Sequence, residues 1–199
     1  MLLFSIVFSL VLAAPCDIVI SEIMYNPDGP TLGDDDSFEW VEFCNIGAGP
    51  VEMYGMMLSD GGNQLFLDPF TLEPGGMVVV AADMQSFKGA YGEDIELVSW
   101  DGVWTKLSNS GDQLTLYSEY GEVLDELSYS DEWGVAEDDT SRSAADGTGS
   151  SLEKVILSGP NDRSNWMPSI DLQCPLLDPD DGCPVSWGTP GQRNSVTSQ

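Results

Sequence analysis

Histidine is absent from this 199-residue chain, and basic residues are scarce. The absence of histidine removes the commonest general base, the usual zinc and copper ligand, and every Ser-His catalytic triad. The 6 lysines and arginines face 34 acidic residues, so the net charge is −28. A surface of this kind repels nucleic-acid phosphates, and we expect no nucleic-acid partner. The charge excess itself indicates solubility or tolerance of salt, with divalent cation binding as the functional alternative.

Long apolar runs are also missing, with one exception at the start of the chain. Residues 1–14 read MLLFSIVFSLVLAA, uncharged and ending in small residues, which predicts a secretory signal peptide. The run is short for a membrane span, although an uncleaved anchor is the alternative. We therefore expect a protein that is secreted or held at the cell surface, in an extracellular or periplasmic setting, with no membrane insertion after signal removal.

The four cysteines follow no Cys-x-x-Cys spacing, which favours a structural role over a redox role. In an exported chain their even number predicts two disulfides, and three pairings are possible. Cys174 and Cys183 enclose a short loop and are expected to pair locally. Cys16 and Cys44 would then pair, because a hairpin between residues 18–24 and 38–45 places them almost opposite each other. Each bridge would contribute about 3 kcal/mol.

Short strands separated by turns are predicted along the chain, because 21 glycines and 12 prolines interrupt it every few residues. One helical turn is expected at residues 84–91 and a flexible loop at residues 137–150. The pattern indicates an all-β, immunoglobulin-like β-sandwich of about seven to nine strands, stapled by disulfides. We expect one domain over residues 16–195 and a disordered tail at 196–199. The predicted strands are 18–24, 38–43, 56–59, 64–67, 77–82, 112–118, 122–129 and 151–156.

An ordered series of segments resembles the lamin tail domain family, in the form found in exported microbial proteins. The segments are IVISEIMYNPDG, SFEWVEFCNIG, MMLSDGG, LEPGGMVVVAAD, LSNSGDQLTLYSEYGEVLDELSY, SLEK and WGTPGQRNS. The resemblance implies an immunoglobulin-like sandwich and no shared catalytic constellation, and exported members typically act as adhesive or accessory modules. This chain lacks a coiled-coil rod and a basic surface, so neither filament assembly nor nucleic-acid contact is implied.

Carboxylates offer the remaining route to catalysis. Glu22, Glu39 and Glu42 lie on two strands that we expect to pair, and two facing carboxylates can serve glycoside hydrolysis. These residues fall inside the family-like segments, where accepting hydrogen bonds from loop amides is the simpler role. We therefore expect no enzyme, with a carboxylate-based hydrolase as the alternative.

Two further sets of residues are candidates for binding. Asp178, Asp180 and Asp181 are clustered oxygen ligands that could bind calcium, although a solvated turn is the simpler interpretation. Tryptophans near predicted loops could form a binding surface: Trp100, Trp104 and Trp133. No other cofactor is expected. The sequence thus predicts a non-catalytic exported binding or scaffolding module for a protein or glycan, with a purely structural calcium-stabilised domain as a further alternative.

Overall fold

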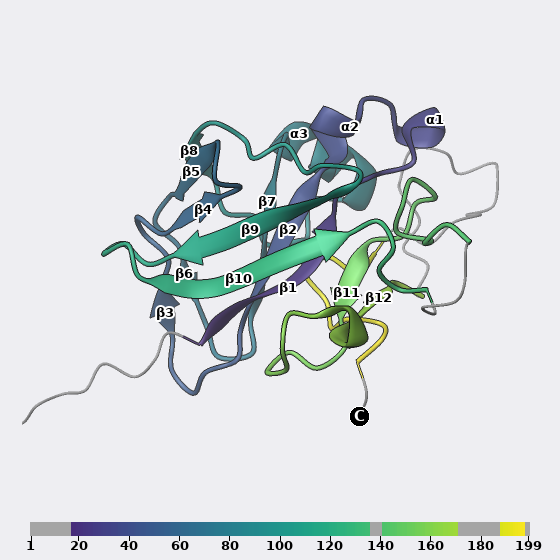
Figure 1. Cartoon of the computed structure of the whole chain (residues 1–199). Helices are drawn as coiled ribbons and strands as arrows, with labels where there is room; N and C mark the ends of the chain where they lie inside the picture. Colours follow the sequence, from purple (N-terminus) through teal and green to yellow (C-terminus); the bar gives the residue numbers. More distant parts are fainter. Residues whose placement is uncertain (1–16, 136–140, 171–187, 198–199) are drawn as a thin grey trace, which may run out of the picture.

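The computed structural model describes residues 17–135, 141–170 and 188–197 as a β-sandwich with few helices (Figure 1). Sheet I has the strand order β12-β11-β1-β2-β7, sheet II has the order β10-β9-β4-β5-β8, and β3 and β6 form a separate pair. The strands are β1 (Ile18–Met24), β2 (Trp40–Asn45), β3 (Val51–Glu52), β4 (Met57–Ser59), β5 (Gln64–Leu67), β6 (Thr71–Leu72), β7 (Met77–Ala81), β8 (Trp100–Gly102), β9 (Gly111–Tyr117), β10 (Val123–Ser130), β11 (Leu152–Lys154) and β12 (Trp166–Pro168). The helices are α1 (Gly29–Leu32), α2 (Asp35–Phe38), α3 (Met84–Tyr91) and the 3-10 turn η1 (Arg163–Asn165).

The main core lies between the two sheets. Alternate residues of β1, β2 and β7 meet alternate residues of β4, β5, β9 and β10, since successive side chains of a strand point to opposite faces. Phe43 from sheet I and Leu116 from sheet II are both fully buried in this core. The apolar alternation that predicted a sandwich is therefore confirmed.

A β-bulge in β1 determines what lies on the outer face of sheet I. The pairing of β1 with β2 shifts between Ile20 and Glu22, so that Ile20 lies opposite Phe43 while Glu22 lies opposite Glu42. The extra residue, Ser21, changes which positions face the core. Ile23 consequently returns to the core, and Glu22 lies on the outer face.

The three α-helices gather at one end of the sandwich (Figure 1). The longest, α3, begins after Asp83, whose carboxylate accepts a hydrogen bond of 2.6 Å from the Ser86 amide. Phe87 of α3 packs edge-on against Trp40 on the outer face of sheet I, with ring centroids 6.1 Å apart. Within the described ranges, no helix is long and apolar enough to cross a membrane.

Some strands were not predicted from the sequence, and the start of another was misplaced. The described ranges contain twelve strands rather than seven to nine. The missed strands are β3, β6, β8 and β12, which are two or three residues long and show no alternation. The strand expected from residue 38 begins at Trp40, after α2. The hairpin of β9 and β10 is confirmed, and a helix is present at residues 84–91, although its eight residues make about two turns rather than the single turn predicted.

The disulfide-stapled version of the fold is not supported. Cys44 has a free, buried thiol, and the other three cysteines lie outside the described residues. The register places Val19 opposite Cys44, whereas the predicted partner Cys16 lies outside the described residues, so that pairing stays a prediction. Burial raises the pKa of the Cys44 thiol to about 11, with a smaller contribution from the nearby Glu42.

Candidate functional site

Three glutamates form a row across the outer face of sheet I. Glu22 on β1 pairs in register with Glu153 on β11 and with Glu42 on β2. All three glutamates are fully buried, with 0% of their surface exposed. Within the described ranges no ion pair involves any of them, and buried carboxyl groups without a cation nearby are costly unless they are hydrogen-bonded or protonated.

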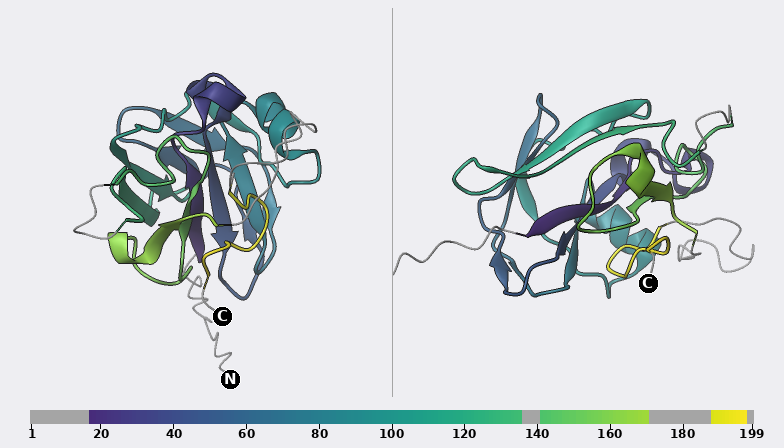
Figure 2. Two further views of the ribbon diagram at one scale, coloured as in Figure 1. Left: turned by 90° about the vertical axis from the view of Figure 1, so that its right-hand side faces the viewer. Right: turned by 60° about the horizontal axis from the view of Figure 1, so that its bottom comes forward.

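The C-terminal clasp, which we define as residues 188–197, lies over this glutamate row (yellow in Figure 2). The Thr189 amide donates to Glu22 Oε1 at 2.8 Å, and the Gly191 amide donates to Glu42 Oε2 at 2.7 Å. Glu153 Oε2 accepts from the Val196 amide at 3.1 Å. Each glutamate of the row therefore binds a backbone amide of one short segment more than thirty residues away in sequence.

The clasp approaches the sheet so closely that one position requires glycine. Gly188 has φ +86°, and a Cβ placed there would lie 2.5 Å from Glu22 Oε1 and 2.6 Å from the Ser151 hydroxyl. Any larger residue would also adopt the left-handed backbone conformation at a cost. Asn194 completes the attachment, because its amide donates to the backbone oxygens of Ser21 at 2.7 Å and of Lys154 at 3.1 Å.

The hydrogen bonds around the glutamate row indicate which of its carboxyl groups carry a proton. The single hydroxyl hydrogen of Thr189 faces two carboxylate oxygens, Glu153 Oε1 at 2.8 Å and Glu22 Oε2 at 3.1 Å. A hydroxyl has one hydrogen to donate, so Thr189 donates to the nearer Glu153 and accepts from a protonated Glu22. Burial, together with the neighbouring Glu42 and Glu153, raises the pKa of Glu22 well above its usual range.

Glu42 also carries a proton at neutral pH. Burial raises its pKa to about 8, although hydrogen bonds from Ser21 and Gly191 lower it. The Ser21 hydroxyl lies 2.6 Å from Glu42 Oε1 and 3.3 Å from the Glu42 carbonyl oxygen. Ser21 can therefore accept the carboxyl proton and donate its own to that carbonyl, which leaves no group without a partner.

Glu39, the third glutamate predicted as a catalytic candidate, does not join the row. It precedes β2 and accepts hydrogen bonds from the Trp104 indole at 2.7 Å and the Leu107 amide at 3.1 Å. Desolvation raises its pKa to about 7, with further contributions from Asp36 and Asp35. Its role is to hold the segment that follows β8.

This geometry favours the simpler of the two predicted roles for the glutamates. Glycoside hydrolysis requires two carboxyl groups that reach one substrate, with room for the sugar between them. Here Glu22, Glu39 and Glu42 are at most 2% exposed, and their oxygens are occupied by hydrogen bonds from the protein itself. The prediction that they accept hydrogen bonds from loop amides is confirmed, and the arrangement offers no opening for a substrate.

The tryptophans predicted as a binding surface are half-buried. Trp100 and Trp104 contact each other, with ring centroids 5.8 Å apart, and both pack against the main core. Their indole N–H groups are used within the protein, since Trp100 donates to the Ala81 carbonyl at 2.9 Å. Trp133 packs against the buried Trp166. Core packing therefore accounts for much of the area of each ring.

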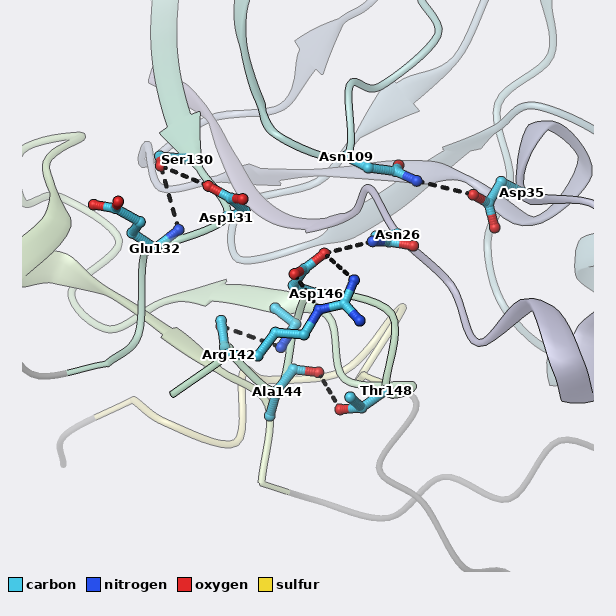
Figure 3. A network of polar contacts seen from close by, with 12 residues as sticks. Asn26, Asp35, Asn109, Ser130, Asp131, Glu132, Arg142, Ala144, Asp146 and Thr148 are labelled. Atoms are coloured by element: carbon cyan, nitrogen blue, oxygen red, sulfur yellow. Dashed lines mark hydrogen bonds and ion pairs between the residues drawn. The ribbon is translucent and has the colours of Figure 1, made fainter. Parts of the chain in front are cut away.

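The segment after β10 contains a network that sequence reasoning missed. Residues 137–150 were predicted as a flexible loop, yet Asp146 is 7% exposed and binds both Arg142 and Asn26 (Figure 3). The Asn26 amide donates to Asp146 at 2.5 Å. The buried Tyr25 hydroxyl has no hydrogen-bond partner among the described residues, and its pKa is raised mainly by burial and next by Asp146. The described part of this segment is therefore packed against the sandwich.

No metal site is found within the described ranges, where no three potential ligands converge. The predicted calcium ligands Asp178, Asp180 and Asp181 lie outside these ranges, so that hypothesis stays a prediction. Asp36 is paired with Lys106, and Asp35 accepts a hydrogen bond of 3.0 Å from Asn109 (Figure 3).

An exposed apolar row crosses the outer face of sheet II. We define it as Phe66, Met57, Tyr117 and Val123, which lie on four adjacent strands and are paired in register. Phe66 is 45% exposed and Val123 57% exposed, while Met57 and Tyr117 are half-buried. The sequence carried a partial signal, because the alternation DQLTLYS assigns Tyr117 to the face opposite Leu114 and Leu116.

Comparison with known families agrees with this architecture. Residues 12–131, more than half of the chain, match the family described as Lamin Tail Domain. The match covers β1 to β10, whereas β11, β12 and the clasp follow it in sequence. No curated protein matches the chain. Lamin tail domains are non-enzymatic, immunoglobulin-like domains. The fold and the family match together show that this chain belongs to the lamin tail domain family.

Proposed function

We propose that this chain is exported and acts as a non-catalytic binding or scaffolding module, in contact with a protein or glycan at the cell surface or in an extracellular assembly. The observation that carries the proposal is the exposed apolar row of sheet II. Exposed apolar surface is unfavourable in water, and contiguous apolar groups on one face mark sites of association.

The glutamate row supports the non-catalytic half of the proposal. Its carboxyl groups are buried beneath the clasp and donate or accept hydrogen bonds within the protein. A general acid or nucleophile must reach its substrate, and these groups do not. The scarcity of basic residues further supports a partner other than nucleic acid.

The test is retention of the purified protein on immobilised, purified glycans and secreted proteins of known identity. A ligand that uses the apolar row is expected to lose its affinity for the variant Phe66→Ser. Met167→Ser is the matched control, because Met167 is 44% exposed on the other sheet and Phe66 is 45% exposed. Ligands that are retained equally by both variants would contradict the assignment of this surface.

The same panel tests the absence of catalysis. Each glycan is incubated with the wild-type protein and with Glu22→Gln, and the released products are measured. We expect no turnover by either protein. Hydrolysis by the wild type that is lost in a folded Glu22→Gln variant would make the protein a carboxylate-based hydrolase.

A further inference from the structure

The apolar row has a charged neighbour in the same register. Asp101 on the edge strand β8 pairs with Phe66, and the row continues through Met57 and Tyr117 to Val123 on β10. The line therefore crosses all five strands of sheet II and ends in an exposed carboxylate. Cross-strand neighbours lie close enough for a single bound chain to contact several of them at once.

Two exposed aromatic side chains lie in turns at one end of the sheet. Tyr54 is 61% exposed and Tyr120 is 83% exposed. They lie in two turns that come close together, since a Cβ placed on Gly55 would lie 3.4 Å from the Cβ of Glu119. Aromatic rings offer a large apolar area together with an electronegative face, which attracts cations.

Sheet II is acidic as well as apolar. Its five strands contain no lysine or arginine, and neither does the turn between β4 and β5 or the turn between β9 and β10. The nearest basic residue in sequence, Lys106, is paired with Asp36. Acidic residues lie on the row or on the strands and turns around it: Asp60, Asp101, Glu119, Glu122 and Glu126.

We propose that the outer face of sheet II binds an extended protein segment that carries arginine or lysine together with apolar side chains on one face, that is, at every second position. This inference rests on the proposed function and names the partner of the same surface. Apolar side chains of the segment cover Phe66, Met57 and Val123, and its cations contact the face of Tyr117 and the carboxylate of Asp101. The charge of the surface disfavours an acidic partner, since like charges brought together repel.

The dimensions of the row define the probe. Five strands spaced about 4.8 Å apart give a row of about 19 Å, which an extended peptide spans with about six residues. A blocked peptide of about eight residues is therefore long enough, with arginine and leucine taking turns at every second position and serine between them, so that both kinds of side chain lie on one face. Three peptides of equal length serve as comparisons. Replacing leucine by serine (arginine–serine) keeps only the charge, and replacing arginine by glutamine (glutamine–leucine) keeps only the apolar groups. Replacing arginine by glutamate (glutamate–leucine) reverses the charge.

Affinities are measured by titration calorimetry at physiological ionic strength, where the attraction between exposed charges more than about 8 Å apart is largely screened. We expect the arginine–leucine peptide to bind more tightly than the other three. Phe66→Ser is expected to weaken its binding by at least about tenfold, since one fully covered aromatic side chain is lost. Asp101→Asn should weaken arginine–leucine binding and leave glutamine–leucine binding unchanged. Met167→Ser should change neither, and circular dichroism confirms that each variant is folded.

The outcomes separate this inference from the proposed function. If arginine–leucine and arginine–serine bind equally tightly and Phe66→Ser does not weaken either, the peptides are attracted only by the overall charge of −28. That result would overturn the inference. Suppose instead that glutamine–leucine or a neutral oligosaccharide binds as tightly as arginine–leucine, and that this binding is lost in Phe66→Ser. The surface is then assigned correctly, and the proposal of a cationic partner is wrong. If no probe responds to Phe66→Ser, and the panel of glycans and proteins also does not, both proposals fail.

Discussion

The protonation of Glu42 can be tested by replacing it with its neutral isostere. In Glu42→Gln the side-chain oxygen can accept from the Gly191 amide, and the new amide group can donate to the Ser21 hydroxyl. The variant thus reproduces the hydrogen bonds of the protonated carboxyl group and cannot ionise. We expect it to be at least as stable as the wild type at neutral pH.

The sign of the pH dependence follows from the direction of the pKa change. The pKa of Glu42 is about 8 in the folded protein and near its ordinary value of 4.5 in the unfolded chain. Below the lower value both states hold the proton, and the stabilisation is fully present. As pH rises through this window, the unfolded chain releases its proton first, so the folded state loses stability until both are ionised.

The magnitude is set by the same two values. One pKa unit corresponds to about 1.4 kcal/mol. As pH rises from about 4 to about 9, the ionisation of Glu42 therefore lowers the free energy of unfolding by up to about 5 kcal/mol. Glu42→Gln removes this contribution. The difference in stability between variant and wild type should therefore grow in favour of the variant as pH rises.

Urea unfolding followed by tryptophan fluorescence at several pH values measures this difference. Glu126→Gln is the matched control, because Glu126 is exposed on β10 and should give a nearly constant difference. If Glu42→Gln instead loses stability relative to the wild type as pH rises, the carboxyl group works as an anion in the folded protein. The assignment of protons in the glutamate row would then be wrong.

Three further predictions concern the clasp, the cysteines and the acidic surface. Gly188→Ala should be less stable in urea unfolding than Gly121→Ala by at least about 1 kcal/mol, because both glycines have positive φ but only Gly188 lies against other atoms; equal losses would contradict the close approach. The buried Cys44 thiol should react with alkylating reagents far more slowly in the native protein than in urea, and a non-reducing peptide map that links it to another cysteine would refute its free state. Sodium chloride should raise the thermal midpoint by screening the charge of −28, and a larger rise in calcium at matched ionic strength, lost in Asp180→Asn, would instead establish a specific site.

The sequence predicted the main elements of the fold because their periodicity is local. The alternation in residues 112–118 and 122–129 predicted a hairpin, and the structure has it as β9 and β10. The short strands of two or three residues were missed because they have no periodicity of their own, and long-range pairing alone makes them strands. The loop at residues 141–150 was misjudged for the same reason, since Asn26 holds it from a distant part of the chain.

The candidate sites divide in a similar way. Glu22 and Glu42 were identified as candidates because they lie on two strands that were predicted to pair, where carboxyl groups can face each other. Their partner Glu153 was not recognised, because its segment is too short to show which face it occupies. The tryptophans were expected at the surface because they lie near loops, but a loop can fold back over the core, as the segment containing Trp104 does.

The sequence by itself determined the all-β class, the acidic charge and the absence of histidine chemistry, because composition and short-range alternation are properties of the chain alone. Only the tertiary structure decided what the carboxyl groups do. A one-residue bulge at Ser21 turns Glu22 outward, sheet pairing aligns it with Glu42 and Glu153, and the clasp covers all three. The same pairing assembles Phe66, Met57 and Tyr117 into one surface, since register between strands depends on contacts that no single segment encodes.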